Sequence, residues 1–126
     1  TIYPTPSTIY DQVAQSDVVV GAVLVAGAKA PKLISREMVN NMNPGAVLID
    51  VAIDQGGCVE GIRPTSHDSP SYTENDVLHY AVTNMPGIVG NMASTSLSNA
   101  TLPYVKILAN EGVHQAIRTT PDWPEE

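Results

Sequence analysis

The sequence has no phenylalanine and only one tryptophan and five tyrosines among its 126 residues. Few large aromatic side chains are therefore available to fill an interior, and any core must consist mainly of Val, Ile, Leu and Ala. Such a core is typical of a parallel β-sheet that is buried on both faces. The hydrophobic fraction of 43% is that of a globular chain, and the length allows one domain or part of one.

Cationic side chains are also scarce, since six Lys and Arg accompany thirteen Asp and Glu and give a formal net charge of -7. This balance argues against the basic surface that binds nucleic acid or an anionic membrane. The longest uncharged stretch, residues 77–105, is interrupted by Asn, Gly and Pro. It is not the run of about 18 apolar residues that a membrane helix requires. We therefore expect no nucleic-acid partner and no membrane partner.

Cysteine occurs once, as Cys58, so no internal disulfide can form. No basic and then apolar leader opens the sequence, and we expect a reducing, cytoplasmic location. Cys58 has no evident base beside it, and a buried inert thiol is the expected role. His67, His79 and His114 lack the paired spacing of zinc ligands, which predicts no metal site.

Start and stop signals predict three helices. They cover about residues 7–15, the stretch from a Ser35 cap to residues 44–45, and about residues 94–110. Thr8 and Asp11 have the spacing of a capping box in the first helix. Pro103 should kink or divide the third helix, and Gly112 should end it.

Three continuous apolar runs, at residues 18–25, 46–53 and 77–83, predict buried strands. The first two flank a helix and form a βαβ unit with right-handed, parallel pairing. Asp50 lies inside the second run, where a buried carboxylate needs hydrogen-bond partners, so we expect it to be structural. The predicted fold class is α/β.

The sequence lacks the glycine fingerprint GxGxxG that opens a dinucleotide-binding domain, and its first element is a helix. We therefore predict the second half of a Rossmann-like, doubly wound parallel sheet followed by C-terminal helices, with the first half absent from the chain. The alternative is a complete small α/β domain, but both edges of its sheet would be poorly covered.

Five motifs, in this order and at this spacing, closely resemble alanine dehydrogenases: GAVLVAGAKAPKL (residues 21–33), VAIDQGGC (51–58), RPT (63–65), NMPG (84–87) and SNATLPY (98–104). The resemblance implies an NAD-dependent enzyme that interconverts L-alanine with pyruvate and ammonia. This chain would be a C-terminal part that is inactive alone. The nicotinamide nucleotide transhydrogenases share the fold and are the second alternative. A non-catalytic nucleotide-binding module is the third.

The resemblance also implies site residues. Asp54 resembles the family's catalytic aspartate, although by itself it could be an ordinary turn residue at a strand end. The implied NAD-binding residues are Val23 and Leu24 on the adenosine side, Val51, Ala52, Ile53, Asp54, Val82, Thr83, Asn84 and Met85 near the nicotinamide ribose, and Arg63. Most of them lie at or near the carboxyl ends of predicted strands, where open α/β sheets bind their ligands. The proton-transferring histidine and the cations that bind the substrate carboxylate would lie upstream, outside this chain.

The predicted organisation has three parts: a partial NAD-binding domain over residues 1–90, a helical segment of the substrate domain over 91–120, and an acidic tail over 121–126. Some members of the resembled family bind magnesium through a Glu and a His on the long helix, but Ile107 and Glu111 occupy the aligned positions here. This departure again predicts no metal. The expected partners are L-alanine or pyruvate, the missing N-terminal part of the enzyme, and further copies in a homo-oligomer, a hexamer by resemblance.

Overall fold

The computed structural model describes residues 1, 3–25 and 27–120. The chain divides into two compact units, Thr1–Met85 and Pro86–Glu126. The predicted acidic tail, residues 121–126, lies outside the described residues.

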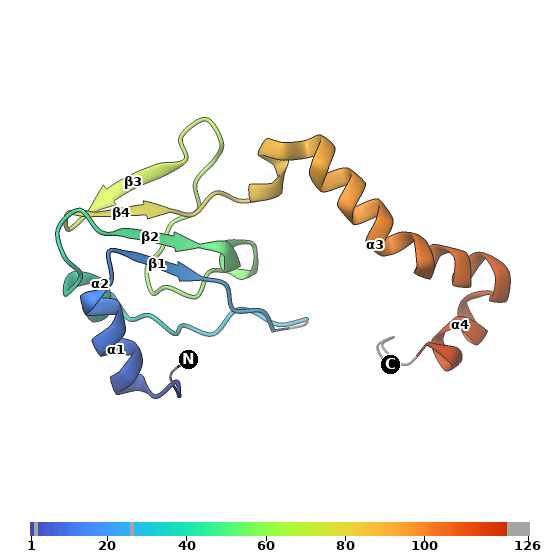
Figure 1. Ribbon diagram of the computed structural model, residues 1–126, viewed down its shortest axis with the longest axis horizontal. Coiled ribbons are helices and arrows are strands. Elements are labelled where there is room, and N and C mark those ends of the chain that lie inside the picture. The colour runs from blue at the N-terminus through green and yellow to red at the C-terminus, as the bar shows by residue number, and fades with distance from the viewer. Residues whose placement is uncertain (2, 26, 121–126) are drawn as a thin grey trace. The chain divides into compact units, whose positions relative to one another are not determined.

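The first unit is built on a four-stranded mixed sheet in the order β1-β2-β4-β3 (Figure 1). Strands β1 (Val18–Gly21), β2 (Val47–Asp50) and β4 (Val77–Tyr80) are parallel, and β3 (Ser71–Glu74) is antiparallel to β4. The α/β prediction is confirmed, with one antiparallel strand added. Among the described residues β1 pairs only with β2, so its outer edge is open.

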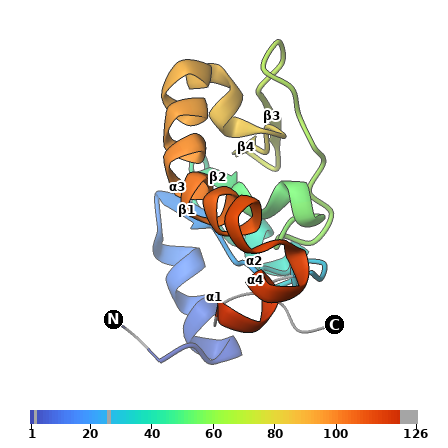
Figure 2. The same cartoon turned by 90° about the vertical axis from the view of Figure 1, so that its right-hand side faces the viewer.

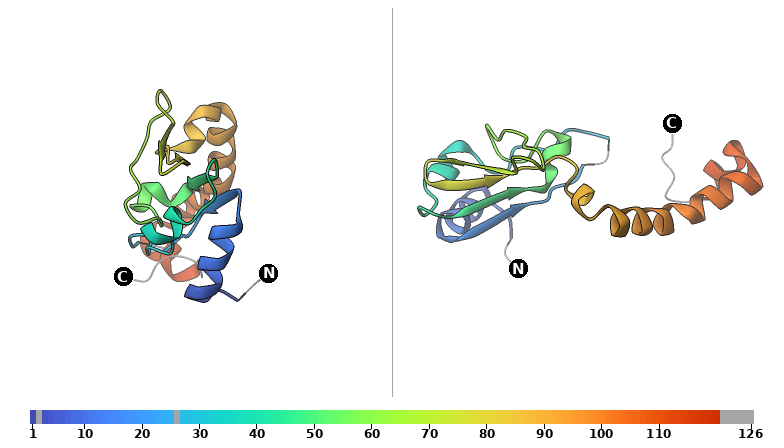
Figure 3. Two further views of the ribbon diagram at one scale, coloured as in Figure 1. Left: turned by 90° about the vertical axis from the view of Figure 1, so that its left-hand side faces the viewer. Right: turned by 90° about the horizontal axis from the view of Figure 1, so that it is seen from above.

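All three predicted strands end earlier than expected, at Gly21, Asp50 and Tyr80. After β2 the chain turns into a 3-10 helix, η1 (Val51–Gln55), which follows β2 directly in Figures 1 and 3. The prediction of a strand through residue 53 was wrong because tight turn bonds form there. The N–H groups of Gly56 and Gly57 donate to the carbonyls of Ile53 and Ala52 at 3.0 and 2.9 Å.

Strand β3, of sequence SYTE, was not predicted. It forms a hairpin with β4 through Asn75 and Asp76, whose φ angles are 52° and 60°. Two positive φ angles in succession are typical of a type I′ turn, whose twist matches that of paired strands. Across the hairpin the rings of Tyr72 and His79 stack with centroids 4.8 Å apart.

One face of the sheet packs against helices α1 (Pro6–Gln15) and α2 (Arg36–Asn40). The interior between them consists of aliphatic side chains from both helices and the strands, including Val13, Val39, Met42, Leu48 and Val77. Ser35 caps α2 as predicted. The capping box of α1 pairs Thr5 with Thr8, so the predicted pair Thr8 and Asp11 was wrong.

The opposite face of the sheet is poorly covered. Its side chains form two rows in register, Val18, Val47 and Leu78 in one and Val20, Ile49 and Tyr80 in the other. Val18 is 55% exposed, Val20 58% and Leu78 37%, which is unusual for aliphatic side chains in the strands of a parallel sheet. This face, which we call the bare sheet face, has the composition of an interior.

After the sheet the chain continues through a second 3-10 helix, η2 (Met85–Val89), into α3 (Gly90–Glu111) and α4 (Val113–Thr119). Helix α3 begins four residues before the predicted start at residue 94, and α4 was not predicted. Gly112, with φ of 74°, ends α3 as expected, and the chain turns sharply there (Figure 2). Pro103 lies inside α3 and does not end it. None of the described helices combines the length and the apolarity that crossing a membrane requires.

Candidate functional site

The carboxyl ends of β1 and β2 lie at the same edge of the sheet, and the segments that follow them enclose a groove of about 340 Å³. Its lining residues are Ala22, Val23, Leu24, Val51, Ala52, Asp54 and Gln55. Five of these seven are sequence-predicted site residues, which the fold brings together from segments about 30 positions apart. Ala22 and Gln55 were not predicted.

Two polar side chains, Asp54 and Gln55, interrupt a mainly apolar lining. The Gln55 Oε1 atom is buried, and among the described residues it has no hydrogen-bond partner. Buried acceptors in native proteins are almost always paired, so Gln55 Oε1 is a polar atom that the described residues leave unsatisfied. The sequence alone could not identify Gln55, because the signal is the environment of one atom.

Asp54 is held in place by the loop that follows β4. The Asn84 N–H donates to both carboxylate oxygens, at 3.2 Å to Oδ1 and 3.4 Å to Oδ2. The Asn84 carbonyl in turn accepts a hydrogen bond of 3.0 Å from Nε2 of His67. The structure therefore joins Asp54 and Asn84, as the position of both residues after predicted strands suggested.

The segment that leaves η1 is also fixed tightly, and we call residues 56–59 the anchored loop. Asp50, which is fully buried, accepts hydrogen bonds from the N–H groups of Cys58 and Val59 at 2.8 and 3.1 Å. These are the partners that a buried carboxylate requires. Burial, together with the negative charge and the hydrogen bond of Asp50, raises the pKa of the Cys58 thiol to about 11. Cys58 is therefore a protonated, inert thiol at neutral pH, as expected.

Comparison with known proteins matches these features to one family. A sequence model described as alanine dehydrogenase/PNT, C-terminal domain, matches residues 1–123. The chain belongs to this family. It is 50% identical over 117 residues to an alanine dehydrogenase of Halomonas elongata, covering 93% of this chain and 32% of the relative. It is 50% identical over 121 residues to an alanine dehydrogenase of Mycobacterium tuberculosis, covering 96% of this chain and 33% of the relative.

Solved structures agree with the family assignment. An L-alanine dehydrogenase superposes with a TM-score of 0.79 at 49% identity, covering 93% of this chain and 32% of that one. A transhydrogenase from Sinorhizobium meliloti superposes less well, with a TM-score of 0.65 at 26% identity, covering 78% of this chain and 31% of that one. The chain thus spans about a third of the length of the curated alanine dehydrogenases that it matches.

The remaining predicted residues of this alanine dehydrogenase-like segment lie around the groove rather than in it. Ile53 and Val82 are buried in the interior, whereas Met85 is half-buried at the start of η2. Thr83 is exposed, and its N–H donates to the carbonyl of Thr65 at 3.2 Å.

Arg63 does not line this groove. Its guanidinium carbon lies 4.1 Å from the centroid of the Tyr72 ring, and its NH2 nitrogen lies 3.8 Å from the carboxylate of Glu74. It borders a second, more open groove with Pro64 and Thr65. The described contacts of Arg63 are thus structural, and its cofactor contact stays a prediction.

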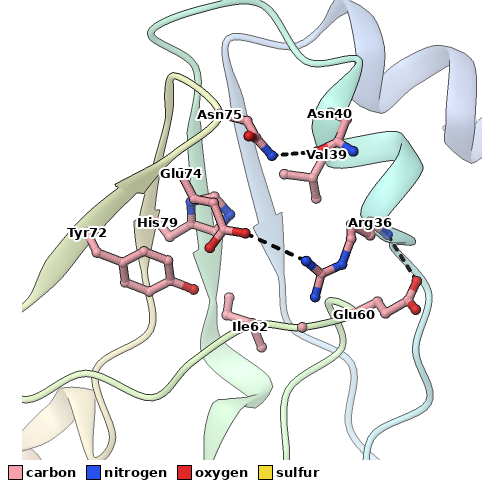
Figure 4. Close-up of a pocket in the computed structure, with 10 residues that line it drawn as sticks. Arg36, Val39, Asn40, Glu60, Ile62, Tyr72, Glu74, Asn75 and His79 are labelled. Carbon is pink, nitrogen blue, oxygen red and sulfur yellow. Dashed lines mark hydrogen bonds and ion pairs between the residues drawn. The ribbon is translucent and has the colours of Figure 1, made fainter.

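A further pocket lies between α2 and the β3–β4 hairpin (Figure 4). Its volume is about 20 Å³, which suits a water molecule rather than a cofactor. Arg36 lies 3.8 Å from the Glu74 carboxylate, and the Arg36 N–H donates to Glu60 at 3.1 Å. Both carboxylates of this pocket therefore have partners among the residues that line it. Among the described residues, no three His, Cys, Asp or Glu side chains are grouped as a metal site would need.

Proposed function

We propose that residues 1–90 of this chain form part of the NAD-binding domain in an alanine dehydrogenase, which interconverts L-alanine with pyruvate and ammonia. The observation that carries the proposal is the Asp54 carboxylate, fixed by Asn84 beside a groove at the carboxyl edge of the sheet. The proposal is supported by 50% identity to alanine dehydrogenases, of which this chain would supply the C-terminal third. The complete polypeptide is called the intact enzyme below.

The residues around the groove fit a dinucleotide. Its apolar lining suits flat rings, and the Asp54 carboxylate beside it suits a ribose hydroxyl. When bound, NAD supplies the acceptor for the hydride. The residues that would hold it are Val23 and Leu24 on the adenosine side, and Val51, Ala52, Ile53, Asp54, Val82, Thr83, Asn84 and Met85 near the nicotinamide ribose, with Arg63 as a further contact.

Asp54 would act through its negative charge. A carboxylate has about four lone-pair positions, and the single Asn84 N–H leaves most of them free for a ribose hydroxyl or for the substrate. Loss of hydride from alanine develops positive charge at the reacting carbon and nitrogen. A carboxylate held in advance near that position stabilises this charge without reorganisation.

The test is the substitution Asp54→Asn in the intact enzyme. It keeps the size of the side chain and removes the charge, so turnover should fall more than NAD affinity. An interaction with a charged group is worth about 1.5–3 kcal/mol, which corresponds to a loss in kcat of about 10-fold to 150-fold. Steady-state NADH formation from alanine measures kcat, and a near-normal value would exclude Asp54 from the chemistry.

Two alternatives remain distinguishable. A transhydrogenase role is favoured only by the structural match at 26% identity, and a non-catalytic nucleotide-binding module would keep the groove without the chemistry. The intact enzyme should form NADH from NAD and L-alanine. Hydride transfer between NADH and NADP without alanine would favour the transhydrogenase, and nucleotide binding without either reaction would favour the module.

We also propose that the helical segment 91–120 belongs to the substrate domain. By family resemblance, the enzyme would be a cytoplasmic homo-oligomer, a hexamer, that serves L-alanine catabolism. Exposed apolar side chains on α3 support contacts with other protein, because Met92, Leu97 and Val105 are 71%, 65% and 56% exposed. Such exposure at helix positions is typical of surfaces that other protein covers. A monomeric mass in light scattering of the intact enzyme would contradict the oligomer.

A further inference from the structure

One peptide group in the anchored loop is held between two opposite charges. The carbonyl of Gly57 accepts a hydrogen bond of 2.7 Å from the Lys32 ammonium. The N–H of Cys58, on the other side of the same peptide bond, donates to the Asp50 carboxylate at 2.8 Å. We propose that Lys32 and Asp50 are positioning residues that fix the catalytic carboxylate of Asp54 through this loop. The inference rests on the proposed function.

Lys32 holds the loop through three carbonyl groups. Its Nζ donates to the carbonyls of Gly56 and Gly57, each at 2.7 Å, and to that of Val59 at 3.2 Å. An ammonium group has three donors, so all of its hydrogen-bonding capacity is used on one short segment. Hydrogen bonds from a charged donor are about twice as strong as neutral ones. Lys32 is an exposed residue, but its ammonium group is bound to the backbone of the loop at three points and holds it in place.

Asp50 holds the loop through its N–H groups. Its Oδ2 accepts from both Cys58 and Val59, and its Oδ1 lies 3.6 Å from the Cys58 sulfur. In the trans peptide between Gly57 and Cys58 the C=O and N–H point in opposite directions, so the two charges lie on opposite sides of it. The positive charge faces the negative end of the peptide dipole and the negative charge faces the positive end. Both charges therefore favour one orientation of this peptide plane.

The close contact between the anchored loop and Asp50 requires glycine at two positions, 21 and 57. Gly57 has φ of 75°, and a Cβ there would come within 2.8 Å of the Asp50 Oδ2. A Cβ at Gly21, the last residue of β1, would collide with the sulfur of Cys58. Two glycines from different segments thus permit the close approach of the loop to Asp50, which is an observation independent of the hydrogen bonds.

The anchored loop fixes the position of Asp54 because Asp50 and its hydrogen bonds to the loop lie on either side of η1. Asp50 immediately precedes η1, and its side chain binds the segment that leaves η1, so residues 51–57 form a closed turn. Within that turn the Gly57 N–H donates to the Ala52 carbonyl at 2.9 Å. Asp54 is the fourth of the five residues of η1. A displacement of a reacting group by 1 Å can lower a rate by about 100-fold, so a loosened loop should reduce turnover.

The test uses Lys32→Met and Asp50→Asn in the intact enzyme, with Lys29→Met as the matched control. Lys29 is an exposed lysine in the same segment. Each loop variant should lower kcat for alanine oxidation by about 10-fold or more and change the KM for NAD by less than about twofold. Lys29→Met should match the wild-type enzyme. If Asp50→Asn does not fold, Lys32→Met decides, because Lys32 is on the surface.

A double-mutant cycle separates positioning from general structural support. If Lys32 acts only through Asp54, adding Lys32→Met to Asp54→Asn should produce no further loss in kcat. Two outcomes would overturn this inference alone. One is that Lys32→Met lowers kcat by the same factor in the wild-type enzyme and in the Asp54→Asn variant. The other is that Lys32→Met has a normal kcat while Asp54→Asn is slow. A normal kcat for Asp54→Asn would overturn the catalytic role in the proposed function and, with it, this inference.

Discussion

The two units of the chain use their apolar residues in opposite ways. In the first unit, Thr1–Met85, aliphatic side chains from both helices and three strands share one interior. In the second unit, none of the 22 residues of α3 is buried, and Ala116 of α4 is buried. The first unit therefore supplies its own core, whereas the apolar side chains of α3 are left exposed or half-buried. Substitutions in the first unit should thus affect stability more than comparable substitutions in α3.

The strongest test of this difference replaces one leucine in each unit of the 126-residue chain. Leu48 is fully buried in β2, and Leu48→Ala should destabilise the first unit by about 2–5 kcal/mol, through lost burial and a residual cavity. Leu97, which is 65% exposed in α3, is the matched position, and Leu97→Ala should cost less than about 0.5 kcal/mol. Urea unfolding followed by circular dichroism measures both. Equal losses would contradict the comparison.

A smaller effect should appear at high pH, because the interior of the first unit contains a titratable thiol. The pKa of Cys58 is raised from 9.0 to about 11, so the folded state holds this proton more tightly than the unfolded state does. The resulting stabilisation is fully present below pH 9 and is lost as pH rises through 11, by about 2–3 kcal/mol.

The control for this pH effect is Cys58→Ser, which does not titrate in this range. The difference in unfolding free energy between wild type and Cys58→Ser should shrink from pH 8 to pH 11. A difference that is constant over this range would show that the thiol has its ordinary pKa in the folded state.

The smallest expected effect lies at the boundary of the two units. Met85 is the last residue of the first unit and is half-buried. Full burial of a Met side chain is worth about 1.5–3 kcal/mol, so Met85→Ala in the intact enzyme should raise the KM for NAD by several-fold, up to about 10-fold. Unchanged cofactor kinetics would assign Met85 and its neighbours to structure only.

The sequence predicted those features that depend on continuous apolar runs. The cores of β1, β2 and β4 could be predicted because buried parallel strands have such runs. The site residues at the ends of these runs are implied by the resemblance to alanine dehydrogenases, and their roles stay predictions. The ends of these strands could not be predicted from the apolar runs. Val51 and Ile53 are as apolar as the residues of β2, and the chain leaves the sheet there because of contacts to Asp50 and the two following glycines.

Other features depend on partners that are distant in the sequence. Strand β3 is a polar strand at the edge of the sheet. The local signal of its hairpin is the pair Asn75 and Asp76, from which we made no prediction. The role of Lys32 depends on carbonyls 24 to 27 positions away, and no local pattern marks it. Helix α3 could be predicted from composition. Helix α4 could not, because it has only seven residues and follows a glycine that we interpreted as a helix end.

The open outer edge of β1 has a consequence for the order in which such a protein assembles. Its unpaired backbone groups, beside the bare sheet face, can pair with any extended strand that reaches them first. In a longer polypeptide made from its N-terminus, earlier segments are already present when β1 leaves the ribosome, and the correct neighbour has an advantage in time. When this chain is synthesised alone, the strands that can reach the open edge come from other copies of the chain. Aggregation through stacked β-strands then competes with folding.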